Sequence, residues 1–173
     1  MHPEAFQFLA DNTPKSARTV LDVGGRDING SPRSLFPGAH FTAVDPIDGP
    51  GVDVVADITK WADERTFTVV ICAEVLEHVK NWQAVVAACF QRVRPGGTLL
   101  LTAATDGRDP HSAYDGGPIR PDEHYRNVQG DKLKAALAEV GAVKVDVVSH
   151  PGRGDVYAVA HRRAKPRARR ERA

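Results

Sequence analysis

Cysteine is scarce in this sequence, and long apolar runs are absent. Among 173 residues there are two cysteines, Cys72 and Cys89, and both lie inside apolar segments rather than in a C-x-x-C pair. This placement predicts two buried thiols, rather than a disulfide, in a reducing compartment, the cytoplasm. No apolar stretch approaches the roughly 20 residues of a membrane helix. The start, MHPEAFQFLADN, carries an acid early and lacks the basic-then-apolar order of a signal peptide, so we expect neither a membrane span nor a secretory leader.

The net charge is close to zero, but the two signs are distributed unevenly. The formal charge of the chain is +1, whereas the last twelve residues, RRAKPRARRERA, hold seven Lys/Arg and one Glu. The segment 162–173 therefore carries +6, and the preceding 161 residues carry −5. We expect a folded domain over residues 1–161 and a disordered basic tail over 162–173. The tail is either a solvated segment or a contact for nucleic acid or an acidic membrane surface.

Apolar patterning divides the domain into strands and helices. Helices are predicted at 3–12, 31–37, around Trp61, at 81–94 and at 131–140. Strands are predicted at 19–22, 40–45, 52–57, 67–73, 98–104, 142–150 and 155–161. The segment FTVVICA (67–73) is almost entirely apolar, which is typical of a strand buried on both faces of a parallel sheet. We predict a single doubly wound α/β domain with a mostly parallel seven-stranded sheet, ending in an antiparallel hairpin at residues 142–161.

The stretch TVLDVGGRDING places an acid and two glycines at the end of the first predicted strand. Ligands of such sheets bind beyond the carboxyl ends of the strands. Gly24 and Gly25 lack a Cβ, so the backbone can approach a ligand closely, although a plain tight turn would use the same pair. Asp45 ends the second strand 23 residues after Asp22, where a carboxylate binds ribose hydroxyls in nucleotide-binding folds. The third glycine of G-x-G-x-x-G is absent, which disfavours a dinucleotide and a nicotinamide-dependent oxidoreductase.

Five motifs in order carry a resemblance to a known family. VLDVGG, FTAVD, VDVVADI, FTVVICAEVLEHV and VRPGGTLLLT, between residues 18 and 104, resemble the class I methyltransferases that use S-adenosylmethionine, in particular the group called type 11. The resemblance implies a Rossmann-like methyltransferase fold with S-adenosyl-L-methionine as cofactor. No N-P-P-Y motif of the DNA amino-methyltransferases is present, because ICAEVL stands in its place.

The resemblance also implies cofactor contacts at the ends of four strands. Those toward the methionine part are Asp22, Gly24, Gly25, Cys72, Ala73 and Glu74. Those toward the ribose and adenine are Asp45, Pro46, Ile47, Asp57 and Ile58. In this pattern Asp22 orients the methionine part, Asp45 binds the ribose hydroxyls and Asp57 faces the adenine amino group. The pair Glu77-His78 matches a pair of the family that holds the local structure, so we do not predict it to be catalytic.

Arg26 departs from the family pattern, which has glycine at this position. Arginine cannot adopt a positive φ cheaply, so the loop must differ in shape or Arg26 must take an ordinary conformation. One hypothesis is that Arg26 pairs with the carboxylate of the cofactor, or with Asp27 or Asp45. The alternative is an arginine that faces solvent.

Residues 105–127 follow the fifth strand and are predicted to form the acceptor side of the site. This loop contains His111, Tyr114, His124, Tyr125 and Arg126. A general base is needed only when the methyl acceptor must lose a proton, and His111 is the first candidate for it. Alternatively these side chains tie down a long loop, a structural or lid role that the resemblance favours for Glu123 and Tyr125. His111, Asp115 and His124 match no metal-ligand spacing, so no metal site is predicted.

The predicted function is S-adenosylmethionine-dependent methyl transfer to an unidentified, small-molecule acceptor. Methyl transfer from a sulfonium needs chiefly an acceptor held in line with the methyl group, so the lack of a catalytic triad is no objection. Two alternatives remain: a non-catalytic binding protein of the same fold, and a nucleic-acid methyltransferase aided by the basic tail.

Overall fold

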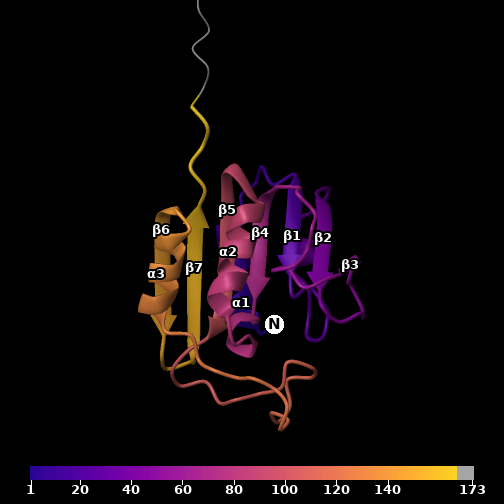
Figure 1. The fold of residues 1–173 in the computed structure, drawn as a ribbon, viewed down its shortest axis with the longest axis vertical. Coiled ribbons are helices and arrows are strands. Elements are labelled where there is room, and N and C mark those ends of the chain that lie inside the picture. Colours follow the sequence, from indigo (N-terminus) through magenta and orange to yellow (C-terminus); the bar gives the residue numbers. More distant parts are fainter. Residues whose placement is uncertain (167–173) are drawn as a thin grey trace, which may run out of the picture.

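The computed structural model of the chain describes residues 1–166. It contains a seven-stranded sheet in the order β3-β2-β1-β4-β5-β7-β6 (Figure 1). The strands are β1 (Thr19–Val23), β2 (His40–Asp45), β3 (Val54–Val55), β4 (Phe67–Ala73), β5 (Val93–Ala104), β6 (Val143–His150) and β7 (Asp155–His161). Strands β1 to β5 pair in parallel, and β7 runs antiparallel to both β5 and β6. The predicted fold class is confirmed.

Helices cover both faces of this sheet. The helices α2 (Trp82–Arg92) and α3 (Gly130–Glu139) contact each other on one face, and α1 (Pro3–Asn12) packs against β5 and β7 on the other (Figure 1). Asn81 caps α2 as its sequence suggests, because its side-chain oxygen accepts a hydrogen bond from the N–H of Ala84 at 3.4 Å.

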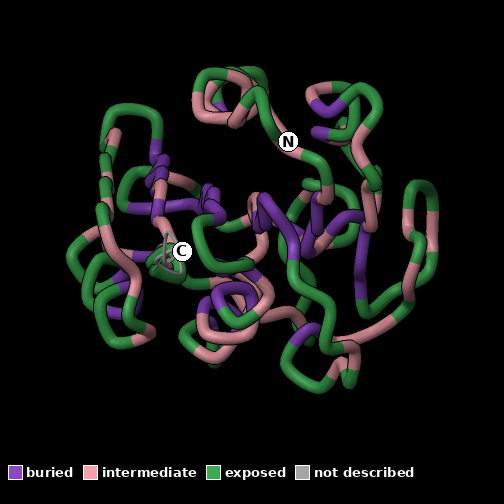
Figure 2. The backbone as a smooth tube through the Cα atoms, turned by 90° about the horizontal axis from the view of Figure 1, so that it is seen from above, coloured by how far each residue is buried: buried purple, intermediate pink, exposed green. Residues whose placement is uncertain are grey.

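Successive residues of β4 face two separate cores. Val69 and Ile71 belong to the cluster that includes Leu9 of α1, whereas Val70 and Cys72 belong to the cluster beneath α2 and α3. Side chains alternate across a strand with period two, so an unbroken apolar run is what a strand between two cores requires. Figure 2 shows the buried residues concentrated in the middle of the molecule, with exposed loops around them. Both cysteines are free and buried, as predicted.

The chain reverses its direction of travel across the sheet at β1. From β1 it moves outward to β2 and β3, then returns to place β4 on the other side of β1. The loops that follow β1 and β4 therefore leave in opposite directions and open a crevice at the carboxyl edge of the sheet. The long connection between β5 and α3 crosses below this edge in Figure 1.

The predicted helix around Trp61 is wrong. Residues 58–60 form a turn, and residues 61–66 have no regular structure. The Trp61 carbonyl accepts a hydrogen bond from the Arg92 guanidinium at 2.6 Å, and that guanidinium lies 5.3 Å from the centre of the Trp61 ring. These contacts with the end of α2 hold the segment extended, so tertiary packing overrides the local pattern.

Two further elements are shorter than predicted. The strand expected at 52–57 is reduced to β3, and before it the Asp53 carboxylate accepts a hydrogen bond from the N–H of Ala43 at 2.8 Å. The helix expected at 31–37 is a 3-10 helix over Pro32–Leu35, with Ser31 capping it through the N–H of Arg33 at 3.2 Å. Among residues 1–166, no helix combines the length and apolar character that spanning a membrane would require.

Leu100→Ala tests the core of β5. Leu100 is fully buried, and its truncation leaves a cavity between the sheet and α1. We expect a loss of about 2–5 kcal/mol in the free energy of unfolding, measured by urea titration. The control is Val148→Ala on β6, whose side chain is 44% exposed and should change stability by less than about 1 kcal/mol. Equal losses in the two variants would contradict the assigned core.

Candidate active site

A cavity of about 830 Å³ opens at the carboxyl edge of the sheet, between the loops after β1, β4 and β5. Its volume lies in the range of small-molecule sites. Seven of the residues predicted from the sequence line it: Asp22, Gly24, Gly25, Arg26, Ala73, Glu74 and His111. Six predicted cofactor residues do not line it: Asp45, Pro46, Ile47, Asp57, Ile58 and Cys72. The structure therefore brings together the residues expected at the methionine end of a cofactor, except Cys72.

Steric limits require both glycines of the first loop. Gly24 has a φ of 76°, and a Cβ at this position would overlap Cγ2 of Val75. A Cβ on Gly25 would lie 2.7 Å from the Cβ of Ala43. The N–H groups of both glycines donate to the Val44 carbonyl, at 2.9 and 3.2 Å. These two donors are therefore occupied by the sheet and are not free to bind a pyrophosphate.

Asp22 contributes a buried carboxylate to the cavity wall. Its residue is only 3% exposed, and burial raises its pKa to about 7, with a smaller contribution from Asp45. The Arg33 guanidinium opposes this shift without bonding to Asp22, because it pairs instead with Asp53 at 2.7 Å. A desolvated carboxylate of this kind favours a cationic ligand group, whose charge would replace the lost hydration.

The six predicted residues outside the cavity differ in their surroundings. Asp45 lies beside the glycine loop, where its carboxylate accepts hydrogen bonds from the N–H of Ile47 at 2.9 Å and of Arg26 at 3.4 Å. Pro46 is exposed on the same loop. Asp57 turns away and accepts from the N–H and hydroxyl of Thr59, at 2.9 and 2.8 Å. The side chains of Ile58 and Cys72 are part of the core.

Arg26 follows neither the solvent-facing alternative nor the pairing with Asp27 or Asp45. Its residue is half-buried, and within residues 1–166 it forms no ion pair with either acid. The guanidinium donates to the Ala113 carbonyl at 3.3 Å and lies 5.7 Å from the centre of the Tyr114 ring. Its Nε is buried without a hydrogen-bond partner in the described chain. Arg26 thus connects the glycine loop to the loop that follows β5.

Glu123 organises the long loop 105–129. Its carboxylate accepts hydrogen bonds from the Ser112 hydroxyl at 2.8 Å, the Ala113 N–H at 2.9 Å and the Arg120 N–H at 2.8 Å. These bonds lower the pKa of Glu123, so it stays ionised at neutral pH. The structural role expected for this residue agrees with these contacts.

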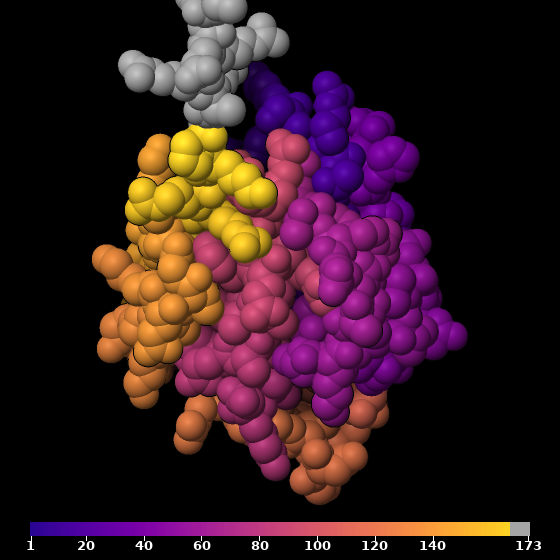
Figure 3. Space-filling view, turned by 45° about the horizontal axis from the view of Figure 1, so that its top comes forward, coloured from indigo at the N-terminus to yellow at the C-terminus, as the bar shows by residue number. Residues whose placement is uncertain are grey.

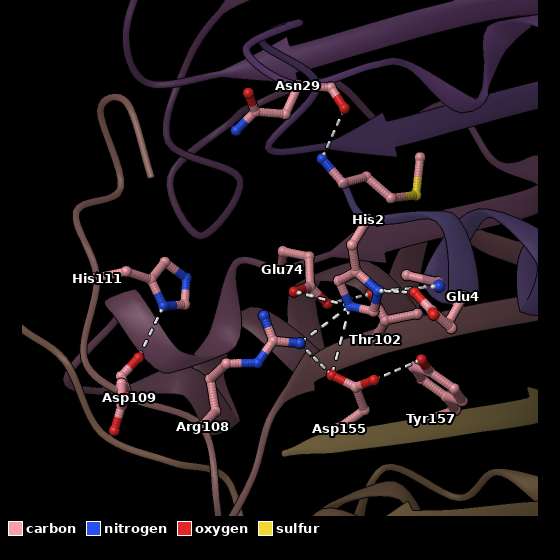
Figure 4. Close-up of polar contacts among 12 residues, drawn as sticks. His2, Glu4, Asn29, Glu74, Thr102, Arg108, Asp109, His111, Asp155 and Tyr157 are labelled. Carbon is pink, nitrogen blue, oxygen red and sulfur yellow. Dashed lines mark hydrogen bonds and ion pairs between the residues drawn. The ribbon is translucent and has the colours of Figure 1, made fainter. Parts of the chain in front are cut away.

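Sequence reasoning missed a polar network on one wall of the cavity (Figure 4). Buried Asp155 pairs with Arg108 and accepts a hydrogen bond from the Tyr157 hydroxyl at 2.8 Å. His2 Nε2 lies 3.4 Å from an Asp155 oxygen and 3.6 Å from a Glu74 oxygen. His2 precedes α1, Glu74 follows β4, Arg108 lies on the loop after β5, and the other two residues belong to β7, so no local pattern in the sequence could have grouped them.

Glu74 has a strained backbone at the end of β4. Its φ is 58°, which is rare for a residue with a side chain, and its carboxylate accepts a hydrogen bond from the Thr102 hydroxyl at 2.8 Å. Strain of this kind costs of order 1–3 kcal/mol and is concentrated at functional sites. This backbone conformation turns the chain from β4 into the segment that carries Glu77 and His78.

Asp22→Asn tests the burial of the Asp22 carboxylate. Because its pKa rises from 3.8 to about 7 on folding, the folded chain binds the proton more tightly, and stability falls as pH rises through this window. Asparagine cannot ionise, so between pH 5 and pH 8 the wild-type chain should lose about 2–3 kcal/mol relative to the variant. Urea unfolding without added ligand measures this, with the exposed Asp48→Asn as control. If the difference in free energy of unfolding between the variant and the wild type is the same at pH 5 and pH 8, the assigned burial of Asp22 is wrong.

A family comparison identifies the class of the chain. A family model described as a methyltransferase domain matches residues 2–147. The chain therefore belongs to the methyltransferase-domain family, which confirms the resemblance drawn from its motifs.

Curated relatives share part of the chain. The ubiquinone biosynthesis O-methyltransferase of Hahella chejuensis is 29% identical over 129 residues, which are 65% of this chain and 53% of that protein. The protein of the same name from Aromatoleum aromaticum is 30% identical over 118 residues, 59% of this chain and 50% of that protein. The chain spans about half the length of these relatives.

Solved structures show the same fold. The 1,6-didemethyltoxoflavin-N1-methyltransferase of Burkholderia thailandensis, with bound S-adenosylhomocysteine, has a TM-score of 0.67 and 17% identity, over 93% of this chain and 77% of that chain. The phosphoethanolamine N-methyltransferase 2 of Haemonchus contortus, with S-adenosyl-L-methionine, has a TM-score of 0.70 and 14% identity, over 92% of this chain and 52% of that chain. At these identities the comparison establishes the architecture.

Proposed function

We propose that the chain binds S-adenosyl-L-methionine at the carboxyl edge of β1 and β4 and transfers its methyl group to a small molecule. The observation that carries this proposal is the buried Asp22 carboxylate beside two sterically required glycines, in a cavity at the switch point of the sheet. The α-ammonium of the cofactor supplies the cation that such a carboxylate favours. Family membership over residues 2–147 supports the same assignment.

The ribose and adenine would occupy the side of the glycine loop nearest Asp45. Asp45 is held by two backbone N–H groups, which fix its carboxylate beside Arg26. An ionised carboxylate in that position offers oxygens to both ribose hydroxyls. Pro46 and Ile47 are exposed next to it and provide an apolar surface for the adenine. Asp57 and Ile58 complete the adenine side in this proposal.

The methyl acceptor would bind between the cofactor and the loop 105–129. This loop supplies Pro110, His111 and Ser112 to the cavity wall. The relatives named above are, by their names, O-methyltransferases of ubiquinone biosynthesis and N-methyltransferases of 1,6-didemethyltoxoflavin and of phosphoethanolamine, which supports a small-molecule acceptor here. The protein's contribution would be to exclude water and hold the acceptor oxygen or nitrogen in line with the sulfonium methyl. His111 is the proposed base for an acceptor that must lose a proton.

The basic tail receives less support as a guide for nucleic acid. Arg162 pairs through its backbone with Gly96 and Gly97, at the amino end of β5 and away from the cavity. Figure 3 shows the C-terminal residues up to 166 at one end of the molecule and the loop 105–129 at the opposite end. Residues 167–173, which include most of the predicted tail, lie outside the described part of the chain. A cytoplasmic location is proposed from the two free, buried thiols.

Asp45→Asn and Asp48→Asn form a matched pair for the cofactor proposal. Asp45 ends β2 and Asp48 lies on the loop that follows, where it is exposed and accepts a hydrogen bond from the neighbouring Gly49 N–H at 2.8 Å. Calorimetry with S-adenosylhomocysteine should show a loss of about 10–100-fold in affinity for Asp45→Asn, as expected for a lost charge-assisted pair. Asp48→Asn should bind as the wild type does. Absence of binding heat and of a thermal shift in the wild type would favour the non-catalytic alternative.

Arg26→Ala tests the proposed pairing of Arg26 with the cofactor carboxylate. The buried Nε without a partner supports this pairing, so the variant should bind S-adenosylmethionine about 10–100-fold more weakly. Decarboxylated S-adenosylmethionine should bind equally to both proteins, because it lacks the group that Arg26 would contact. Arg120→Ala is the control, since Arg120 also lies over Tyr114 but pairs with the exposed Asp115. If Arg26→Ala binds S-adenosylmethionine as tightly as the wild type does, the proposed pairing is wrong and Arg26 only connects the glycine loop to the loop after β5.

A further inference from the structure

Three potential metal ligands converge beside the cavity. Glu77 and His78 belong to a 3-10 helix (Leu76–His78) that follows β4, and His111 belongs to the loop that follows β5. One ligand atom of each residue lies within 4.8 Å of the others. Because β4 and β5 are parallel neighbours, the segments that follow them meet at the same edge of the sheet. The sequence does not show this grouping, because 33 residues separate His78 from His111.

Several buried polar atoms in this cluster have no hydrogen-bond partner in residues 1–166. They are both carboxylate oxygens of Glu77, Nδ1 of His78 and the hydroxyl oxygen of Tyr125. Glu77 is completely buried, and the Tyr125 ring lies 5.5 Å from the His78 ring and 5.0 Å from the His111 ring. Buried polar groups nearly always have a partner, and each unsatisfied one costs about 1–3 kcal/mol. A bound ion would give the Glu77 carboxylate and the His78 imidazole a partner, whereas the Tyr125 hydroxyl is not among the three ligands.

The tautomer of His111 is set by its surroundings. Its Nδ1 lies 3.1 Å from the backbone oxygen of Asp109 (Figure 4). A carbonyl oxygen only accepts hydrogen bonds, so Nδ1 carries the proton and Nε2 presents a lone pair. An imidazole that ligates a metal characteristically donates its other N–H to a backbone carbonyl or a carboxylate in this way. His111 is therefore prepared to coordinate an ion through Nε2.

We propose that Glu77, His78 and His111 bind one divalent transition-metal ion, of which zinc is the representative, at the edge of the cavity. Two imidazoles and one carboxylate suit zinc and its first-row neighbours better than magnesium or calcium, which take oxygen ligands. Around a tetrahedral zinc with bonds of roughly 2.0–2.1 Å, ligand atoms are roughly 3.3 Å apart. The ligand atoms now lie within 4.8 Å of one another, so binding would draw them closer together.

The ion would keep a coordination position that faces the cavity. His78 and His111 line the cavity, whereas Glu77 lies behind them in the core. Three protein ligands with one open position are the arrangement of catalytic rather than structural zinc sites. The chemical class of acceptor that fits is a hydroxyl compound, because coordination lowers the pKa of a bound hydroxyl and orients its oxygen. This role rests on the proposed methyl transfer, whereas the binding of the ion does not. In the metal-bound form His111 would be a ligand and not the base, because coordination occupies the lone pair of its Nε2, and the ion would instead promote loss of the acceptor's proton.

Metal titration of the full chain tests the proposal. The protein is stripped with a chelator, and Co²⁺ is added as a visible probe of coordination, with Zn²⁺ followed by calorimetry. One ion should bind per chain, with the intense visible absorption of a four- or five-coordinate site. His111→Ala, on the loop and away from the core, should weaken binding by at least about 10-fold. His78→Ala should do the same.

Two controls separate this site from other histidines. His124→Ala removes an imidazole from the same loop, and His2→Ala removes one from the opposite wall of the cavity. Neither should alter the stoichiometry or affinity. If no ion binds, or if binding is equal in His111→Ala, His78→Ala and the wild type, the proposal is overturned and Tyr125 and Glu77 are structural. A rise in the melting temperature with Zn²⁺ that is present in the wild type and lost in His111→Ala would support it.

The same samples distinguish this proposal from the cofactor proposal. Binding of S-adenosylhomocysteine is measured with and without Zn²⁺. Metal binding without cofactor binding would overturn the methyltransferase proposal and leave the metal site standing. Cofactor binding without metal binding would overturn the metal site and leave the methyltransferase proposal standing.

Discussion

The parallel pairing of β1 with β4 is the contact on which the site depends. It places strands from distant parts of the sequence side by side at the centre of the sheet, with Asp22 opposite Ile71. Because β2 continues on the far side of β1, the loops after β1 and β4 diverge and leave room for a ligand between them. The glycines follow from this geometry, since Gly24 must pass Val75 at the end of β4 and Gly25 must pass Ala43 of β2. Asp22 is buried because it lies on β1, between β2 and β4.

The long loop 105–129 is held mainly by polar contacts, with Val128 packed in the core near its end. Glu123 collects three donors within the loop, and Arg26 ties it to the glycine loop. Arg108 binds it to Asp155 at the start of β7. Most of these contacts are partly accessible to water, so the defined shape of the loop depends on polar contacts near the surface.

The structure gives Glu77 and His78 a neighbour, His111, that the family pattern did not predict. The sequence suggested that this pair holds local structure, and the complete burial of Glu77 is consistent with that. Packing also places His111 next to the pair, and three rings come into edge contact at 5.0–5.5 Å. Burial and the neighbouring His111 lower the pKa of His78 to about 4, so its imidazole is neutral at physiological pH. A neutral imidazole can act as a ligand to a metal ion, whereas a protonated one cannot.

Sequence reasoning predicted the parts of the site that belong to single strands and their loops. The acid and glycines after β1 and the apolar run of β4 were found because each is a local pattern with its own physical requirement. The elements it misjudged, near Trp61 and Asp53, are short segments whose shape is set by Arg92 and Ala43 from elsewhere in the chain. The family match and the fold agree with the motifs from residue 18 to 104 and add the order of the strands.

The sequence was sufficient for the fold class, because strand and helix periodicity and the direction of parallel connections leave few topologies open. It also predicted which residues would meet beside β1 and β4, since those residues end strands that must meet at one edge; their contacts with a cofactor stay a prediction. The wall made by His2, Glu74, Arg108 and Asp155, and the cluster of Glu77, His78 and His111, exist only in the folded chain. Side chains from separate segments become neighbours through the packing of the sheet and its loops, and no spacing in the sequence encodes that distance.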